Sequence, residues 1–254
     1  MPGVAPDAEL RRAAALVFVE DLDAPVLGDG DAHHLGEVLR LRPGEAVAAA
    51  DGAGSWRMCA FVTLGAGKRR AAAGSSPSCA LEVAGPLRRT SRPLPVIGVG
   101  FSWAKAERTE WAVAKLVELG VDVITPLVAD RTVVRPDAEA GGRRSERLRR
   151  IVREAAMQSR RPMLPELAES QSVDEFVGRV GGAGVALAEP GGAPLTLVTP
   201  AVLVGPEGGW STRELALVEE KVGLGDGVLR VETAALVAGA LLSSLRGAAL
   251  LSSP

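Results

Sequence analysis

Histidine and cysteine are scarce in this chain of 254 residues. The two histidines, His33 and His34, are adjacent, and the two cysteines, Cys59 and Cys79, lack the spacing of metal ligands. A zinc centre and a Ser-His-Asp hydrolase both need an imidazole at a defined place, so neither class fits this composition. Two thiols build no disulfide framework, and we expect both to be buried. The sequence therefore predicts no metal site.

Long apolar runs are also missing. No uninterrupted apolar stretch reaches the length that a membrane span requires. The N-terminal segment Met1–Arg12 contains acidic side chains and no apolar signal core. We therefore expect a soluble, cytoplasmic protein without a membrane partner. Hydrophobic residues still make up 47% of the chain, which suffices for one large or two small domains.

Charge of one sign is not in excess, because the formal net charge is −2. The bulk charge therefore does not indicate a nucleic-acid binder. The distribution is more informative, since only four of the 29 basic residues are lysine and a cluster of arginines lies between Arg143 and Arg161. The planar guanidinium suits phosphate, but a solvated helix face gives the same cluster. Charge alone leaves both interpretations open.

The hydrophobic pattern divides the chain into a β-rich part and a part in which strands and helices alternate. We predict a small β domain over residues 1–87, a linker over residues 88–94 and a larger domain over residues 95–254. The linker is inferred from the prolines and arginines around it. Within the β domain, a helical segment at 33–40 places Leu35, Val38 and Leu39 on one face. The strands expected there are 16–19, 45–50, 55–64 and 79–84, with a hairpin turn at 51–54.

The second part alternates regularly between strands and helices. Ser145 is a plausible N-cap for the arginine-rich helix, and Ser211 with Glu214 forms a capping box. Alternation of this kind predicts an α/β fold with a parallel sheet covered by helices on both faces. The expected strands are 96–101, 121–128, 185–188 and 201–204, and the expected helices are 107–119, 145–159, 174–180 and 234–250.

The sharpest motif is a glycine-rich turn at Gly205–Gly209, with the letters GPEGG, between an apolar strand and the capped helix. Ligands of open α/β sheets bind at the carboxyl ends of strands, where glycines let main-chain groups approach closely. The alternative is an ordinary strand–helix turn. A phosphate loop is excluded, because the chain has no Gly-Lys-Ser/Thr triplet.

A second glycine turn, Leu224–Ala234, carries a charged pair at the start of the last helix. Glu232 near a helix N-terminus is favoured by the helix dipole, so a capping role is its simplest interpretation. Arg230 has no such explanation. It either pairs with Glu232 or faces a ligand.

Four stretches of the chain, in the right order, resemble the 16S ribosomal RNA uracil-N3 methyltransferase family of the SPOUT superfamily. The first is His34–Gly44, with the letters HLGEVLRLRPG, and the second runs from Lys115 to Thr132. The third is Glu154–Pro165, and the fourth combines the two glycine turns. The chain departs from the family in the strand Leu16–Phe18, where the family usually has an arginine.

This resemblance implies a PUA-like β-barrel domain for RNA binding, followed by a parallel α/β domain with a C-terminal trefoil knot. It also implies S-adenosylmethionine as cofactor, a homodimer, and 16S ribosomal RNA or the 30S subunit as substrate. Carried over residue by residue, it implies catalysis by Arg230 and Glu232. The cofactor contacts implied are Leu187, Glu189, Val204, Gly205, Pro206, Glu207, Gly208, Gly209, Leu224, Gly225, Val228, Leu229, Arg230 and Thr233. The candidate RNA contacts are His34, Arg40, Arg42, Lys105, Arg108, Arg131, Arg149, Arg153 and Arg160. For His34 the alternative, which the sequence favours, is a role in capping or flanking the N-terminal helix.

Methylation of uracil N3 requires loss of the N3 proton and in-line attack on the sulfonium methyl group. Negative charge develops on O2 and O4, so we expect Arg230 to donate to the uracil or to a phosphate. Glu232 or Glu207 is the expected proton acceptor. The rival interpretations are another SPOUT enzyme acting on a ribose hydroxyl or a transfer RNA base, a non-catalytic ribosome-assembly protein, and an unrelated nucleotide-binding α/β enzyme.

Overall fold

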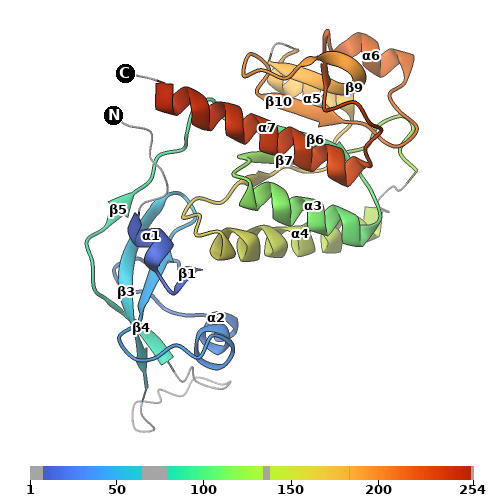
Figure 1. Cartoon of the computed structure of the whole chain (residues 1–254). Coiled ribbons are helices and arrows are strands. Elements are labelled where there is room, and N and C mark those ends of the chain that lie inside the picture. The colour runs from blue at the N-terminus through green and yellow to red at the C-terminus, as the bar shows by residue number, and fades with distance from the viewer. Residues whose placement is uncertain (1–7, 65–78, 134–137, 183, 253–254) are drawn as a thin grey trace. The chain divides into compact units, whose positions relative to one another are not determined.

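The computed structural model describes residues 8–64, 79–133, 138–182 and 184–252 (Figure 1). The chain forms two compact units. The N-terminal unit contains residues up to Arg92 together with the short return segment Ala156–Leu164. The C-terminal unit contains Pro93–Ala155 and the residues from Pro165 onward. The domain boundaries predicted at residues 87 and 95 stay predictions, and the return segment was not foreseen.

The N-terminal unit is built on a five-stranded sheet in which β1 pairs parallel with β2 and the other pairings are antiparallel. The turn between β2 and β3 lies at the predicted place. There the Asp51 carboxylate accepts hydrogen bonds from the N–H groups of Ala53 and Ser55 at 2.7 and 2.9 Å. The elements are α1 (Ala8–Arg12), β1 (Ala15–Phe18), β2 (Ala46–Ala50), β3 (Ser55–Thr63) and β4 (Cys79–Val83).

The predicted linker contains the fifth strand of this sheet, β5 (Arg88–Arg89), which pairs antiparallel with β3. The reason is the buried Trp56 on β3, whose indole N–H needs an acceptor. It donates to the Thr90 hydroxyl at 3.0 Å, and the Arg88 guanidinium lies 5.7 Å from the ring centroid. Because these partners are far apart in sequence, the local composition did not reveal the strand.

The predicted helical segment at 33–40 is present, but its geometry differs from expectation. Helix α2 (Asp29–His33) runs directly into a π-helical turn, His34–Val38. Leu35 is fully buried, whereas Val38 and Leu39 are 58% and 41% exposed. The predicted shared apolar face is therefore wrong, because only Leu35 of the three packs into the core of the unit.

The C-terminal unit contains a six-stranded sheet in the order β11-β9-β10-β6-β7-β8, and every pairing in it is parallel. This confirms the predicted parallel sheet. Val202 and Leu203 point to opposite faces and are both fully buried, so both faces of the sheet are covered at β10. The strands are β6 (Gly98–Ser102), β7 (Val123–Leu127), β8 (Glu166–Leu167), β9 (Val185–Pro194), β10 (Ala201–Val204) and β11 (Glu220–Gly223).

Helix positions in this unit agree with the sequence in outline. The arginine-rich helix α4 begins before Ser145, the predicted N-cap, because Ala138, Glu139 and Ala140 are strong helix formers that extend it. The capping box of Ser211 and Glu214 is confirmed at the start of α6. The helices are α3 (Ala106–Glu118), α4 (Ala138–Gln158), α5 (Val173–Val180), α6 (Thr212–Leu217) and α7 (Val231–Ser252).

Helix α7 contradicts the expectation that no segment has the length and apolarity of a membrane span. Residues Val231–Leu251 meet both criteria, and 33% of their most apolar stretch is buried. One such helix is a weak indication of a membrane span, because core helices of soluble proteins also meet the criteria. Here α7 packs on α3 and on strands β6 and β10. It also carries Arg246, which is buried in an ion pair with Asp122.

Candidate cofactor and methyl-transfer site

A cavity of about 340 Å³ lies where the middle of β9 and the end of β10 meet the loop before α7. This volume is within the range typical of small-molecule sites, and the place is the one expected for ligands of open α/β sheets. Both glycine turns singled out in the sequence contribute to its wall. The lining residues are Ala188–Pro190, Val204–Glu207, Gly209, Trp210, Leu224, Gly225, Gly227–Arg230 and Ala234.

Most residues predicted to bind the cofactor line this cavity, but three do not. Leu187 is buried in the core beneath it with Leu203 and Trp210. Gly208 points its carbonyl at Arg131, and Thr233 is exposed on α7. The predicted residues in the wall are Glu189, Val204, Gly205, Pro206, Glu207, Gly209, Leu224, Gly225, Val228, Leu229 and Arg230. As cofactor contacts, all fourteen stay predictions.

Trp210 is the main lining residue that the sequence argument missed. Its indole N–H donates to the Ala188 carbonyl at 3.0 Å. This hydrogen bond joins the middle of β9 to the residue that follows the cofactor turn, Gly205–Gly209. A Cβ on Gly205 would lie 2.9 Å from the Trp210 ring, so only glycine fits at this position. A large aromatic residue directly after two glycines was the available signal.

The wall of the cavity combines main-chain surface with apolar side chains. Gly209 and Gly225 adopt φ angles of +70° and +135°, which side chains rarely allow, and at these positions the wall is bare main chain. Val228 is 96% exposed and Leu229 is 36% exposed, so both offer apolar surface that a flat base can cover. Such a mixture of apolar enclosure and a few convergent polar groups is typical of cofactor sites. Among the described residues, no group of three or more His, Cys, Asp or Glu is placed to bind a metal ion.

The two predicted catalytic residues differ in their surroundings. Arg230 is exposed and lines the cavity, which favours the ligand-facing interpretation of its role. Glu232 is buried in the first turn of α7, and its Oε1 lies 3.5 Å from Nε of Arg108 on α3. Its Oε2 is buried without a hydrogen-bond partner among the described residues. An unpaired buried carboxylate oxygen is costly, which makes Glu232 unusual in this fold.

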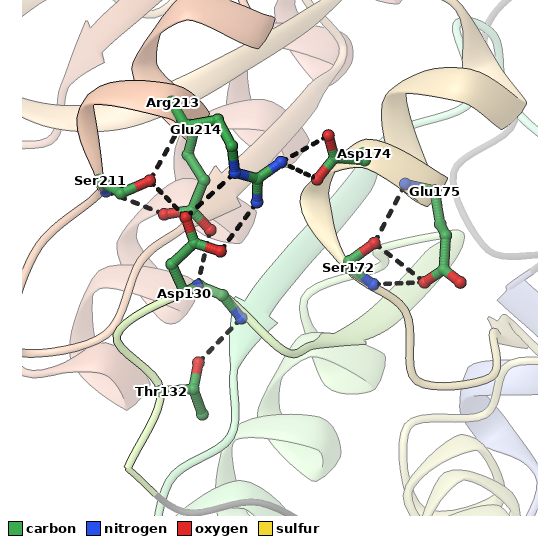
Figure 2. Close-up of polar contacts among 9 residues, drawn as sticks. Asp130, Thr132, Ser172, Asp174, Glu175, Ser211, Arg213 and Glu214 are labelled. Atoms are coloured by element: carbon green, nitrogen blue, oxygen red, sulfur yellow. Dashed lines mark hydrogen bonds and ion pairs between the residues drawn. The ribbon is translucent and has the colours of Figure 1, made fainter.

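A polar network beside the cofactor turn joins three segments of the C-terminal unit (Figure 2). The Asp130 carboxylate accepts from the Ser211 hydroxyl at 2.5 Å and from two nitrogens of Arg213 at 2.8 and 3.3 Å. Arg213 also donates to both carboxylate oxygens of Asp174 on α5, at 2.6 and 2.5 Å. These hydrogen bonds raise the pKa of the Arg213 guanidinium, and those that it donates to Asp130 have a larger effect than those that it donates to Asp174. The loop after β7, α5 and the start of α6 are thereby tied together.

Comparison with known proteins identifies the family. A family described as RNA methyltransferase domain matches residues 90–243, and one described as RNA methyltransferase PUA domain matches residues 27–68. Ribosomal RNA small subunit methyltransferase E of Mycobacterium bovis is 33% identical over 247 residues, which cover 89% of each chain. This chain belongs to the ribosomal RNA small subunit methyltransferase E family.

Further relatives agree with this family. The methyltransferase E of Synechocystis is 31% identical over 236 residues, covering 84% of this chain and 70% of its own. The crystal structure of methyltransferase E from Neisseria gonorrhoeae bound to S-adenosyl methionine has a TM-score of 0.73 and 25% identity to this chain. It covers 91% of this chain and 97% of its own. The predicted family, α/β class and PUA domain are confirmed, while the trefoil knot stays a prediction.

The residues predicted to contact RNA have varied surroundings in this family member. His34, Arg40 and Arg42 are exposed in the N-terminal unit, and Lys105 is exposed at the start of α3. In the C-terminal unit, Arg149 is exposed and pairs with Glu169 at 2.5 Å, Arg153 is half-buried, and Arg108 pairs with Glu232.

Two of the predicted RNA-contact residues donate to main-chain carbonyls. The Arg160 guanidinium donates to Ala13 and Ala14 at 3.3 and 2.7 Å, and burial lowers its pKa. Arg131 donates to Gly208 at 2.8 Å. Both contacts give the side chain a structural role, and the predicted RNA contacts stay untested.

Proposed function

We propose that this chain is an S-adenosylmethionine-dependent enzyme that methylates N3 of a specific uridine in 16S ribosomal RNA. The observation that carries this proposal is the cavity formed where the two glycine turns meet, within a domain that matches the RNA methyltransferase family. The relative from Neisseria gonorrhoeae, which shares the fold over almost its whole length, was solved with S-adenosyl methionine bound. The methyl-transfer cavity and the family therefore support the same chemistry.

The bound cofactor supplies an electrophilic methyl group, and the chain supplies binding and orientation. We propose that the cofactor turn and the loop Leu224–Leu229 hold the cofactor through main-chain groups and apolar side chains. Arg230 then donates to the uracil oxygens on which negative charge develops. Glu207, exposed at the cavity wall, and Glu232, buried one residue into α7, are the two carboxylates proposed to accept the N3 proton.

For the substrate, we propose 16S ribosomal RNA, either naked or within the 30S subunit. The PUA domain match over residues 27–68 supports RNA binding by the N-terminal unit. We also propose that the enzyme is a cytoplasmic homodimer whose C-terminal segments form a trefoil knot. Trp111 on α3 is 47% exposed and Leu241 on α7 is 39% exposed, and exposed apolar side chains on two packed helices favour self-association.

The proposed function predicts a defined product. Wild-type enzyme incubated with radiolabelled cofactor and with 16S ribosomal RNA or 30S subunits is expected to transfer label to one uridine. Mass spectrometry of nuclease digests should identify that nucleoside as N3-methyluridine. Label on a ribose hydroxyl or on transfer RNA would instead support another SPOUT activity. Absence of both transfer and cofactor binding in calorimetry would support a non-catalytic assembly protein.

The arginine-rich helix α4 provides a test of RNA docking. We expect simultaneous replacement of Arg149, Arg150 and Arg153 by alanine to weaken RNA binding and to reduce the slope of log K against log salt. Each lost phosphate contact should lower the slope by roughly 0.7 to 0.9. The measurement is a binding titration at several salt concentrations. An unchanged slope would leave α4 as a solvated helix face.

A further inference from the structure

The segment that follows β7, Ala129–Thr132, does not line the cavity. Arg131 contacts the cofactor turn at Gly208, and Asp130 contacts Ser211 just beyond the turn (Figure 2). The segment itself is held in shape, because the Ala129 N–H donates to the Thr132 hydroxyl at 2.8 Å and the Thr132 N–H donates to the Ala129 carbonyl at 3.0 Å. Asp130 and Arg131 lie between the two hydrogen-bonded residues of this loop, and their side chains extend toward the cofactor turn and the residues after it. Any effect they have on the cofactor must therefore act through the turn.

Arg131 holds one peptide group of the cofactor turn. Its guanidinium donates to the Gly208 carbonyl at 2.8 Å. The N–H of the same peptide group, that of Gly209, donates to the Pro206 carbonyl at 2.8 Å. Both ends of the Gly208–Gly209 peptide are thus engaged, which opposes its rotation. Rotation would otherwise be easy, because neither flanking residue has a Cβ.

Asp130 holds the chain at Ser211, just after the end of the cofactor turn. Its carboxylate accepts from the Ser211 hydroxyl at 2.5 Å, and its main-chain N–H donates to Oε1 of Glu214 at 2.9 Å. Glu214 is only 1% exposed, and its Oε2 accepts from the Ser211 N–H at 2.9 Å. Ser211 directly follows Trp210, which lines the cavity. The exit of the turn is therefore fixed by a buried, fully paired carboxylate and by Asp130.

Asp174 provides a comparison within the same network. It pairs with the opposite side of Arg213 and is about as exposed as Asp130, with side chains 45% and 39% accessible. No contact described for Asp174 reaches the segment from Gly205 to Ser211. Loss of Asp174 therefore removes an ion pair of the same type from the same arginine without touching the turn.

We propose that Asp130 and Arg131 are positioning residues that keep the cofactor turn in its binding conformation and thereby set the affinity for S-adenosylmethionine. This inference rests on the proposed function. When a turn occupies its competent conformation only part of the time, the apparent Kd rises by the inverse of that fraction. The rate at saturating cofactor changes little, because the bound complex has the same geometry.

The test measures cofactor Kd by calorimetry, kcat and KM by methyl transfer, and Tm for four variants. Asp130→Ala and Arg131→Ala are expected to raise Kd and KM for the cofactor roughly tenfold, with kcat within about twofold of wild type. Arg131→Lys should recover much of the affinity, since an ammonium group can donate to the same carbonyl. The matched control, Asp174→Ala, should lower Tm about as much as Asp130→Ala while leaving Kd unchanged.

Two results would overturn the inference. An equal rise in Kd for Asp174→Ala and Asp130→Ala would show that general loosening of the network is responsible. Unchanged cofactor affinity in Arg131→Ala, together with weaker RNA binding and a shallower salt slope, would make Arg131 an RNA contact. Failure of the proposed function is separate, because it would appear as wild-type enzyme that binds no S-adenosylmethionine.

Discussion

Replacement of Arg230 by alanine is expected to lower kcat for methyl transfer by roughly 100- to 1000-fold, the usual cost of removing a donor aimed at developing charge. Arg230 is exposed and lines the wall of the cavity, so its guanidinium is accessible to a bound base. Because the charge appears only in the transition state, cofactor affinity should change far less than the rate. Single-turnover transfer at saturating cofactor, beside calorimetry, separates the two quantities.

The conservative variant sharpens this test. Arg230→Lys keeps the positive charge but not the planar fork, so an intermediate rate is expected if both oxygens of the uracil are contacted. Wild-type kcat in Arg230→Ala would exclude a catalytic role for this residue. A large loss of cofactor affinity with normal kcat would instead make Arg230 a cofactor contact only.

Replacement of Arg246 by alanine is expected to destabilise the C-terminal unit by about 3–5 kcal/mol, because it removes the cationic partner of a buried carboxylate. Arg246 and Asp122 are 6% and 2% exposed and form an ion pair. Arg246 also donates to the Gly120 carbonyl at 2.9 Å, and Asp122 accepts from the Ile97 N–H at 3.1 Å. The pair thus joins α7 to the entrances of two adjacent strands. Urea denaturation followed by circular dichroism measures the loss.

Two further variants distinguish a buried pair from ion pairs in general. Arg147 pairs with Glu110 but is 66% exposed, so Arg147→Ala should lower the free energy of unfolding far less than Arg246→Ala does. The double variant Asp122→Asn with Arg246→Met should be less destabilised than Arg246→Ala, since it leaves no unpaired charge. Equal stability of Arg246→Ala and Arg147→Ala would contradict the burial argument.

Elements with strong local signals were predictable from the sequence. The Ser211–Glu214 capping box, the alternation of strands with helices and the glycine turns all depend on residues within a few positions of each other. The short strands β5, β8 and β11 were missed because long-range pairing defines them. β11, for example, approaches β9 so closely that a Cβ on Gly192 would lie 2.5 Å from Val222. The composition of the sequence around a short strand does not indicate which distant strand it will pair with.

The sequence predicted which main-chain segments form the candidate site, but it did not predict the contacts of the charged side chains around that site. The cavity wall was predicted because glycine marks where a backbone must be accessible. The sequence does not indicate which group an arginine will contact, because the same N–H donors bind a phosphate, a carboxylate or a carbonyl. Arg131, Arg160 and Arg108 were all predicted as RNA contacts. In the fold they contact, respectively, a turn carbonyl, two strand-entry carbonyls and a buried glutamate.

The return of Ala156–Leu164 to the N-terminal unit means that neither unit is a single continuous stretch of polypeptide. Within that unit the Leu164 N–H donates to the Gly52 carbonyl at 2.9 Å, and Arg160 engages the main chain just before β1. Cutting the gene after Arg92 would thus not yield two self-sufficient modules. The shorter fragment would lose the hydrogen bonds that Arg160 donates. Evolution could exchange this unit between enzymes only together with a piece of its neighbour.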